Sequence, residues 1–179
     1  LPYTATAPGT NDYVSLPAGT TNVLVTAAGN TGVVAIPATD LDLSAGQQYT
    51  VYATGTLAGG IEPFITLDDD RPVATEAQVR ILHLSPSAGP VDIYVTEPMA
   101  DITDIEPAFA GVEFRQETGY VSLAGGDYDV TVTVADTKTA AIGPLTVTLS
   151  DGGVYTAAAR DPDPAVANDT FGVIVLDDF

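Results

Sequence analysis

The stretch AQVRILHLSPSAGPVDIYV, residues 77–95, contains three side chains of the types used in nucleophilic catalysis. His83, Ser85 and Asp92 could act as base, nucleophile and orienting carboxylate in a hydrolase. A hydrolase also needs an oxyanion site and an exposed nucleophile, and the chain has no GxSxG sequence that would supply them. Ser85 and Pro86 equally suit a tight turn, with His83 hydrogen-bonded to a neighbour. We therefore predict a structural turn that joins two strands into a hairpin, and no enzymatic activity.

Metal binding is a second chemistry that the side chains could support. A zinc site needs three or four nitrogen or sulfur ligands, but the chain has one His and no Cys. Calcium prefers carboxylate oxygens. Since no acidic cluster has the spacing of an EF-hand, we expect solvated strand ends and no cofactor, with Ca²⁺ bridging adjacent modules as the alternative. The candidate ligands are Asp68, Asp69, Asp70, Asp161, Asp163, Asp177 and Asp178.

The composition excludes some partners and favours export. The 179 residues include 24 Asp and Glu against five Lys and Arg, which gives a formal net charge of −19. A phosphate backbone or an anionic membrane surface would be repelled, so we predict no binding to nucleic acid and no membrane insertion. The sequence begins at Leu1 rather than Met, from which we expect a processed or partial chain. An acidic, Lys-poor chain suits a secreted or cell-surface protein.

The residues that must position these side chains follow a strand pattern. Apolar and polar residues alternate in segments rich in Val, Thr, Ile and Tyr, and clusters of Gly, Pro, Asn and Asp separate these segments. Because no segment has convincing helical periodicity, we expect at most one helical turn, near residues 99–110. The pattern predicts an all-β fold. Clear examples are TNVLVTA at 21–27, QQYTVYATG at 47–55, YDVTVTVAD at 128–136 and FGVIVLDD at 171–178.

An internal repeat divides the chain into two units. A boundary in DDDRPVATE, where few contacts should cross, gives unit 1 at residues 1–70, a linker at 71–76 and unit 2 at 77–179. We predict two tandem antiparallel β-sandwiches of immunoglobulin-like type. The matching segments are YVSLPAGTTNVLVT from Tyr13 and YVSLAGGDYDVTVT from Tyr120, LSAGQQYTVYA from Leu43 and LSDGGVYTAAA from Leu149, and FITLDDD from Phe64 and FGVIVLDDF from Phe171.

Aromatic residues recur within this repeat. Tyr13 corresponds to Tyr120, and Tyr49 corresponds to Tyr155. Exposed tyrosines could form a platform for sugars. Recurrence at equivalent strand positions instead favours a role in packing, as in a tyrosine corner.

The stretch 77–95 has no earlier copy, because its counterpart would precede Leu1. It predicts two strands, at 78–84 and 91–96, and unit 1 would lack the equivalents of both. Loss of leading strands would expose core side chains and unpaired backbone groups. Three explanations remain open. The chain could begin late, another molecule could supply the strands, or residues 1–12 or 77–95 could take the vacant place.

The stretch 77–95, followed by GYVSLAGGDYDVTVT and LSDGGVYTAAA, resembles the domain of unknown function 4397 family. The resemblance extends over essentially the whole chain. It implies exported bacterial or archaeal proteins with β-sandwich modules, often in tandem, and it implies no catalytic residues. The family often has an acidic residue after Ser-Pro, where this chain has Ser87.

We therefore expect a non-enzymatic structural protein, secreted or at the cell surface, that acts as a subunit of a fibre or surface assembly. Its partner would be another copy of the chain, joined by strand pairing at unit 1. The alternative is a monomeric ligand-binding or adhesion module that binds a glycan, a peptide or Ca²⁺ through loops at one end of a sandwich.

Overall fold

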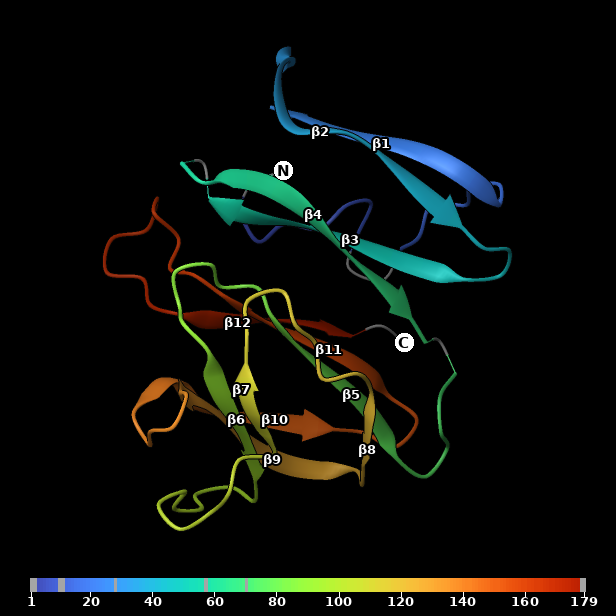
Figure 1. Cartoon of the computed structure of the whole chain (residues 1–179). Helices are drawn as coiled ribbons and strands as arrows, with labels where there is room; N and C mark the ends of the chain where they lie inside the picture. The colour runs from blue at the N-terminus through green and yellow to red at the C-terminus, as the bar shows by residue number, and fades with distance from the viewer. Residues whose placement is uncertain (1–2, 10–11, 28, 57, 70, 178–179) are drawn as a thin grey trace. The chain divides into compact units, whose positions relative to one another are not determined.

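The computed structural model describes residues 3–9, 12–27, 29–56, 58–69 and 71–177, and its described residues form twelve strands and no helix (Figure 1). This confirms the predicted all-β fold. The chain divides into unit 1, Leu1–Asp70, and unit 2, Arg71–Phe179. The strands are β1 Gly19–Ala27, β2 Asn30–Leu43, β3 Gln48–Thr56, β4 Gly60–Asp68, β5 Ala77–His83, β6 Val91–Thr96, β7 Phe109–Val112, β8 Val121–Leu123, β9 Gly126–Val134, β10 Ala140–Leu149, β11 Val154–Arg160 and β12 Gly172–Asp177.

Unit 2 is a sandwich of two four-stranded sheets. One sheet has the order β10-β9-β6-β7 and the other has the order β12-β11-β5-β8. Within these sheets β5 runs parallel to β11, with Arg80 opposite Thr156, whereas the other paired strands are antiparallel. The sheets of unit 2 are therefore antiparallel, as predicted, except at this pair. Strand β5 lies between β11 and β8 and is antiparallel to β8.

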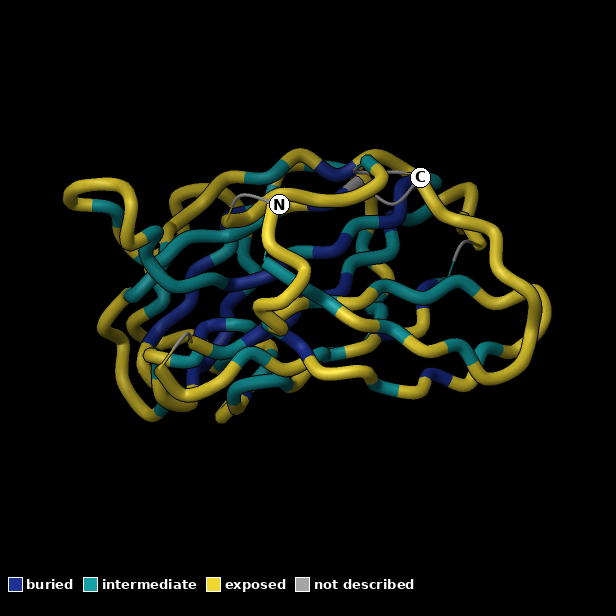
Figure 2. Tube along the Cα trace, turned by 90° about the horizontal axis from the view of Figure 1, so that it is seen from above, coloured by how far each residue is buried: buried dark blue, intermediate teal, exposed yellow. Residues whose placement is uncertain are grey.

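The core of unit 2 lies between its two sheets. Side chains of period-two strands point alternately to opposite faces, so each sheet contributes one apolar face to this layer. Among the described residues of unit 2, most of the buried positions lie in the strands, and Figure 2 marks the buried positions along the trace in dark blue. The buried cluster consists of Ile81, Val91, Ile93, Val112 and Val132.

Unit 1 consists of two hairpins. Strands β1 and β2 form one two-stranded sheet, and β3 and β4 form another. The register of the first hairpin repeats that of β9 and β10, since Gly19 lies opposite Leu43 as Gly126 lies opposite Leu149. By this correspondence β1, β2, β3 and β4 are the equivalents of β9, β10, β11 and β12. The described part of unit 1 thus forms four strands that match half of the sandwich of unit 2.

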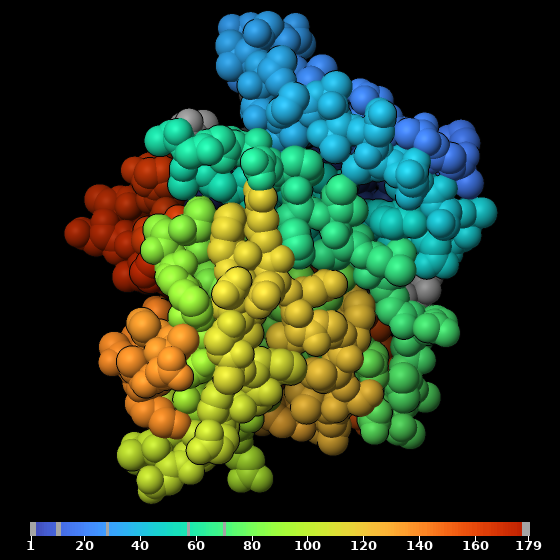
Figure 3. Space-filling view, viewed as in Figure 1, coloured from blue at the N-terminus to red at the C-terminus, as the bar shows by residue number. Residues whose placement is uncertain are grey.

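The longest connection in unit 2 joins β6 to β7. Two turns bend it, with the amide of Ala100 donating to the carbonyl of Glu97 and the amide of Ile105 donating to the carbonyl of Ile102. Figure 3 shows the chain between β6 and β8, coloured yellow-green to yellow, on the surface of unit 2. Among the described residues there is no helix with the length and apolar character needed to cross a membrane.

Candidate functional site

The two strands predicted from the unrepeated stretch form as β5 and β6, but the predicted hairpin between them is wrong. Strand β5 lies in one sheet of unit 2 and β6 lies in the other. The connection 84–90 therefore crosses the sandwich from sheet to sheet. Packed sheets are about 10 Å apart, a distance that this connection spans more easily than a two-residue hairpin turn would.

His83 ends β5 and is only 1% exposed. Its Nε2 atom lies 3.1 Å from the carbonyl oxygen of Gly89, and its Nδ1 atom lies 3.4 Å from the amide nitrogen of Ser85. With the hydrogen on Nε2, the ring donates to Gly89 and accepts from Ser85. The ring of Phe114 lies against it edge-on, at 6.4 Å between centroids. The imidazole thus holds both ends of the crossing connection.

Ser85 is 2% exposed, and its hydroxyl donates to the carboxylate of Asp161 rather than to His83. The amide and hydroxyl of Ser87 donate to the same carboxylate oxygen, at 3.3 and 2.9 Å. Pro86 lies between the two serines. A hydrolase needs its serine hydroxyl hydrogen-bonded to the histidine, so this geometry serves to anchor the connection. Asp161, distant in sequence, is a partner that the sequence analysis did not pair with Ser85.

Asp92 lies on β6, in the other sheet, and is 5% exposed. Its carboxylate accepts hydrogen bonds from the amide of Gly111 at 2.8 Å and from the amide of Asp136 at 2.9 Å. These bonds attach β7 and the turn between β9 and β10 to β6. Asp92 therefore serves a different part of the unit from His83 and Ser85, and the three residues do not form one hydrogen-bonded chain.

Several acidic residues accept hydrogen bonds from donors of the protein. Asp161 accepts from serines, and Asp163 accepts from the amide of Ala165 at 2.8 Å. A hydrogen bond from Arg160, supported by the amide of Asp163, lowers the pKa of Asp169 to about 2. In the described part of the chain, no three acidic or histidine side chains form a group that could hold a metal ion. Of the calcium candidates, Asp70, Asp178 and the side chain of Asp177 lie outside the described residues.

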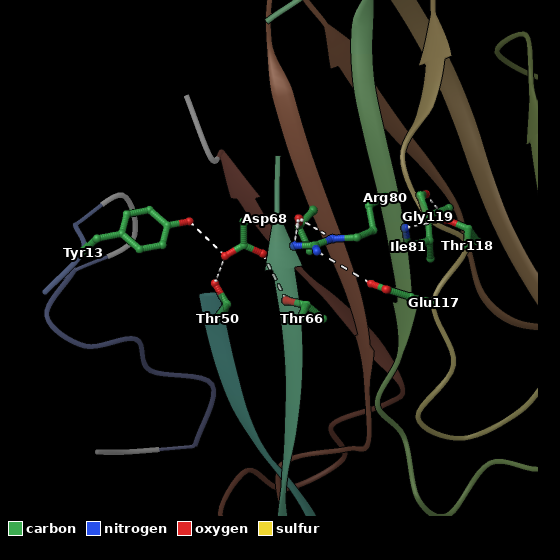
Figure 4. Close-up of polar contacts among 10 residues, drawn as sticks. Tyr13, Thr50, Thr66, Asp68, Arg80, Ile81, Glu117, Thr118 and Gly119 are labelled. Atoms are coloured by element: carbon green, nitrogen blue, oxygen red, sulfur yellow. Dashed lines mark hydrogen bonds and ion pairs between the residues drawn. The ribbon is translucent and has the colours of Figure 1, made fainter. Parts of the chain in front are cut away.

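Asp68 illustrates this use of carboxylates in unit 1. It is 6% exposed and accepts hydrogen bonds from the hydroxyls of Tyr13 at 3.2 Å, Thr50 at 2.6 Å and Thr66 at 3.1 Å (Figure 4). Asp69 follows it directly at the end of β4. The contacts of Asp68 thus fasten the segment before β1 to the second hairpin.

In unit 2 the buried charged residue with comparable contacts is Arg80. The sequence analysis did not single out this residue. It is 1% exposed and donates to the hydroxyl of Thr156 from Nε and Nη2, at 3.2 and 3.0 Å. Its guanidinium lies 4.7 Å from the ring centroid of Tyr120 and 3.6 Å from the carboxylate of Glu117. Since Tyr120 and Thr156 are the repeat equivalents of Tyr13 and Thr50, the same pair surrounds an arginine here and a carboxylate in unit 1.

The second tyrosine pair has the same contact in both units. The hydroxyl of Tyr49 accepts from the amide of Ser44 at 3.2 Å, and the hydroxyl of Tyr155 accepts from the amide of Ser150 at 3.2 Å. Each bond closes the turn that leads into the tyrosine's own strand.

The edges of the strands distinguish the two units most clearly. In unit 2, β9 pairs with both β10 and β6, and β11 pairs with both β12 and β5. Within the described residues of unit 1, the equivalent strands β1 and β3 each pair on one edge only, with β2 and β4. The second edge of β1 corresponds to the edge of β9 that pairs with β6. The second edge of β3 corresponds to the edge of β11 that pairs with β5.

The sequence Tyr-Val-Ser-Leu occurs in both units with different structures. In unit 2, Val121–Leu123 forms β8, which pairs with β5. In unit 1, residues 14–16 have the same three side chains but no strand structure, and Val14 and Leu16 are 66% and 53% exposed. Identical residues thus form a strand only where a strand equivalent to β5 is present as a partner.

The apolar face of the second hairpin in unit 1 is also exposed. Val51 lies opposite Ile65, as Ala157 lies opposite Val175 between the sheets of unit 2. Val51 and Ile65 are each 38% exposed, and Leu67, on the same face, is 53% exposed. The side chains on this face are of the kind that fill a sandwich core.

The match between the two LDD sequences does not hold in the structure. Leu67 lies opposite Tyr49, but its sequence equivalent Leu176 lies opposite Thr156, one position away from the tyrosine. A shift of one residue turns a strand's side chains to the other face. Leu176 is accordingly 7% exposed, whereas Leu67 is largely exposed.

The fold and these edges define an all-β protein with one eight-stranded sandwich and one four-stranded unit related to it by a repeat. The chain belongs to the family described as Domain of unknown function (DUF4397), whose family model matches residues 3–94. This confirms the resemblance seen in the sequence, over a shorter span than the whole chain. The matched segment begins in unit 1 and ends within β6, so it coincides with neither unit. No curated protein matches the chain.

Proposed function

We propose that this protein is a non-enzymatic structural subunit of an extracellular or cell-surface assembly, in which strands of a neighbouring molecule complete unit 1. The observation that carries the proposal is the contrast between the two Tyr-Val-Ser-Leu segments. Residues 14–16 have the sequence of an edge strand and are exposed, and the second edge of β3 pairs with no strand among the described residues.

The expected donor is a strand pair with the pattern of β5 and β6. One donor strand would pair with β3 and with residues 14–16, and the other would pair with β1. Adding strands to an open edge uses backbone hydrogen bonds for affinity and alternate side chains for specificity. Burial of Val51, Ile65 and Leu67 would contribute about 1.5–3 kcal/mol each. A contact of this type between a donor and a different acceptor surface is head-to-tail and can extend into a polymer.

Size measurements on the 179-residue chain test the proposal. Light scattering over increasing protein concentration should show growing oligomers. A double variant, V51K and L67K, places two charges on the face to be buried and should leave monomers at every concentration, because an unpaired charge there would be desolvated. The matched control is V166K, which changes an exposed valine of unit 2, 54% exposed, and should assemble as the parent does.

A synthetic peptide of residues 77–96 provides a second arm, because it carries both candidate strands. It should bind the parent chain and cap its oligomers, whereas a peptide with the same residues in scrambled order should do neither. A parent chain that remains monomeric at all concentrations and does not bind the peptide would refute strand complementation.

A further inference from the structure

Unit 2 has an apolar cavity between its two sheets that is partly open to solvent. The cavity has a volume of about 230 Å³, and residues from all eight strands of the unit line it. Interiors of proteins are normally packed as densely as organic crystals, with few voids larger than a water molecule. A void of this size in the middle of a sandwich therefore requires an explanation.

Small side chains on β11 create part of this space. Ala157 points into the cavity, and its repeat equivalent in unit 1 is the larger Val51. A second void of about 20 Å³ adjoins the first, and both are lined by Ala157 and Val175. The smaller void leads toward the edge strands β10 and β12, where Leu145 is 39% exposed and Val175 is 51% exposed. The smaller void is thus partly open to solvent at these two side chains.

The polar groups of the lining are already hydrogen-bonded. The hydroxyl of Tyr128 donates to the carbonyl of Ala124 at 3.0 Å, and the hydroxyl of Tyr155 accepts from the amide of Ser150. The hydroxyl of Thr148 donates to the carboxylate of Asp127 at 2.6 Å. The rings of Tyr128, Tyr155 and Phe109 therefore present apolar surface, and among the described lining residues none is charged.

We propose that this cavity binds a small, uncharged, apolar molecule with one or two rings. An apolar cavity of about 150 Å³ stays dry and binds benzene, so a larger one has room for a bigger molecule of the same class. Three aromatic side chains in the lining offer ring-to-ring contacts. An anionic amphiphile such as a fatty acid fits poorly, because the chain carries a net charge of −19 and no described lining residue is basic.

The proposal concerns unit 2 alone and does not depend on the completion of unit 1. Naphthalene is a suitable probe, because it has two rings, no charge and no hydrogen-bonding group. Titration into the full chain with ¹³C-labelled methyl groups should give saturable shifts of the Val79, Val95, Val121 and Val130 methyls. Exposed Val166, which is not a lining residue, should not shift and serves as the internal control.

A cavity-filling variant tests the location. A157L should weaken naphthalene binding at least tenfold and abolish the increase in melting temperature that naphthalene causes in the parent chain. A165L is the matched control, because it makes the same substitution at an exposed loop position. Should A157L fail to fold, V95L provides a smaller filling of the same space, and the methyl shifts of the parent chain remain decisive. Shifts scattered outside the lining, absence of saturation, or equal binding by the filled variants would overturn the proposal.

Discussion

At the scale of single residues, buried polar side chains of unit 2 act as fasteners between elements. Ser85 bonds Asp161, and Arg80 bonds Thr156. Each partner lies far away in the sequence, so neither bond could be read from the local pattern. Residue types alone were compatible with a catalytic trio as well as with a turn, and the sequence analysis favoured the turn. The three-dimensional contacts add the partner of the serine hydroxyl, which is Asp161.

The first prediction concerns the stability that Asp92 contributes. Replacing it by Ala should lower the free energy of unfolding by about 2–4 kcal/mol, because two amide donors would lose a charged acceptor in a part-buried setting. Urea unfolding followed by circular dichroism measures this change. D104N, at an exposed position in the connection between β6 and β7, should change stability by less than about 0.5 kcal/mol. Equal stabilities of D92A and the parent would show that Asp92 does not fasten β7 to the sheet.

At the scale of elements, strands could be predicted well and their partners poorly. Alternation and turn residues located β5 and β6, because period-two burial is a local property of the sequence. The same pattern does not tell whether two successive strands form a hairpin or enter opposite sheets, since that depends on which edges other strands offer. Register is similarly non-local, and the one-residue shift between Leu67 and Leu176 arises in the pairing of each hairpin.

The candidate site, the unpaired strand edges of unit 1, could be predicted only in outline. The repeat comparison identified the strands that unit 1 does not match, because sequence similarity aligns equivalent strands directly. It could not show that residues 14–16 form no strand, since their sequence equals that of β8. Strand formation here depends on a neighbouring edge and not on intrinsic preference.

Hydrogen exchange of residues 14–16 provides the prediction at this scale. Their amides should exchange rapidly in dilute solution, whereas the amides of Val121–Leu123, paired with β5, should exchange more slowly. Addition of the 77–96 peptide should slow exchange at residues 14–16 at least tenfold, because a new strand partner would accept or donate their backbone hydrogen bonds. Unchanged exchange at these amides, with the peptide demonstrably bound, would place the peptide elsewhere and contradict the proposed pairing.

At the scale of the whole molecule, electrostatic repulsion between copies of the chain opposes the strand pairing proposed for unit 1. A chain with a net charge of −19 repels its own copies, and this repulsion limits non-specific aggregation of exposed strand edges. Strand pairing acts at short range through backbone hydrogen bonds and apolar burial, which salt affects little. Assembly can therefore occur only where the local contact exceeds the long-range repulsion.

This balance predicts the salt dependence of assembly. Raising the ionic strength from about 0.01 M to about 0.1 M shortens the screening length from about 30 Å to about 10 Å. Oligomers of the parent chain should therefore form at lower protein concentrations as NaCl increases, because the repulsion between acidic copies weakens while the paired strands are unaffected. Sedimentation at several salt concentrations measures this shift, with the V51K and L67K double variant as the control that should remain monomeric throughout. Dissociation by added salt would instead mean that attraction between opposite charges holds the copies together, and strand complementation would no longer account for the assembly.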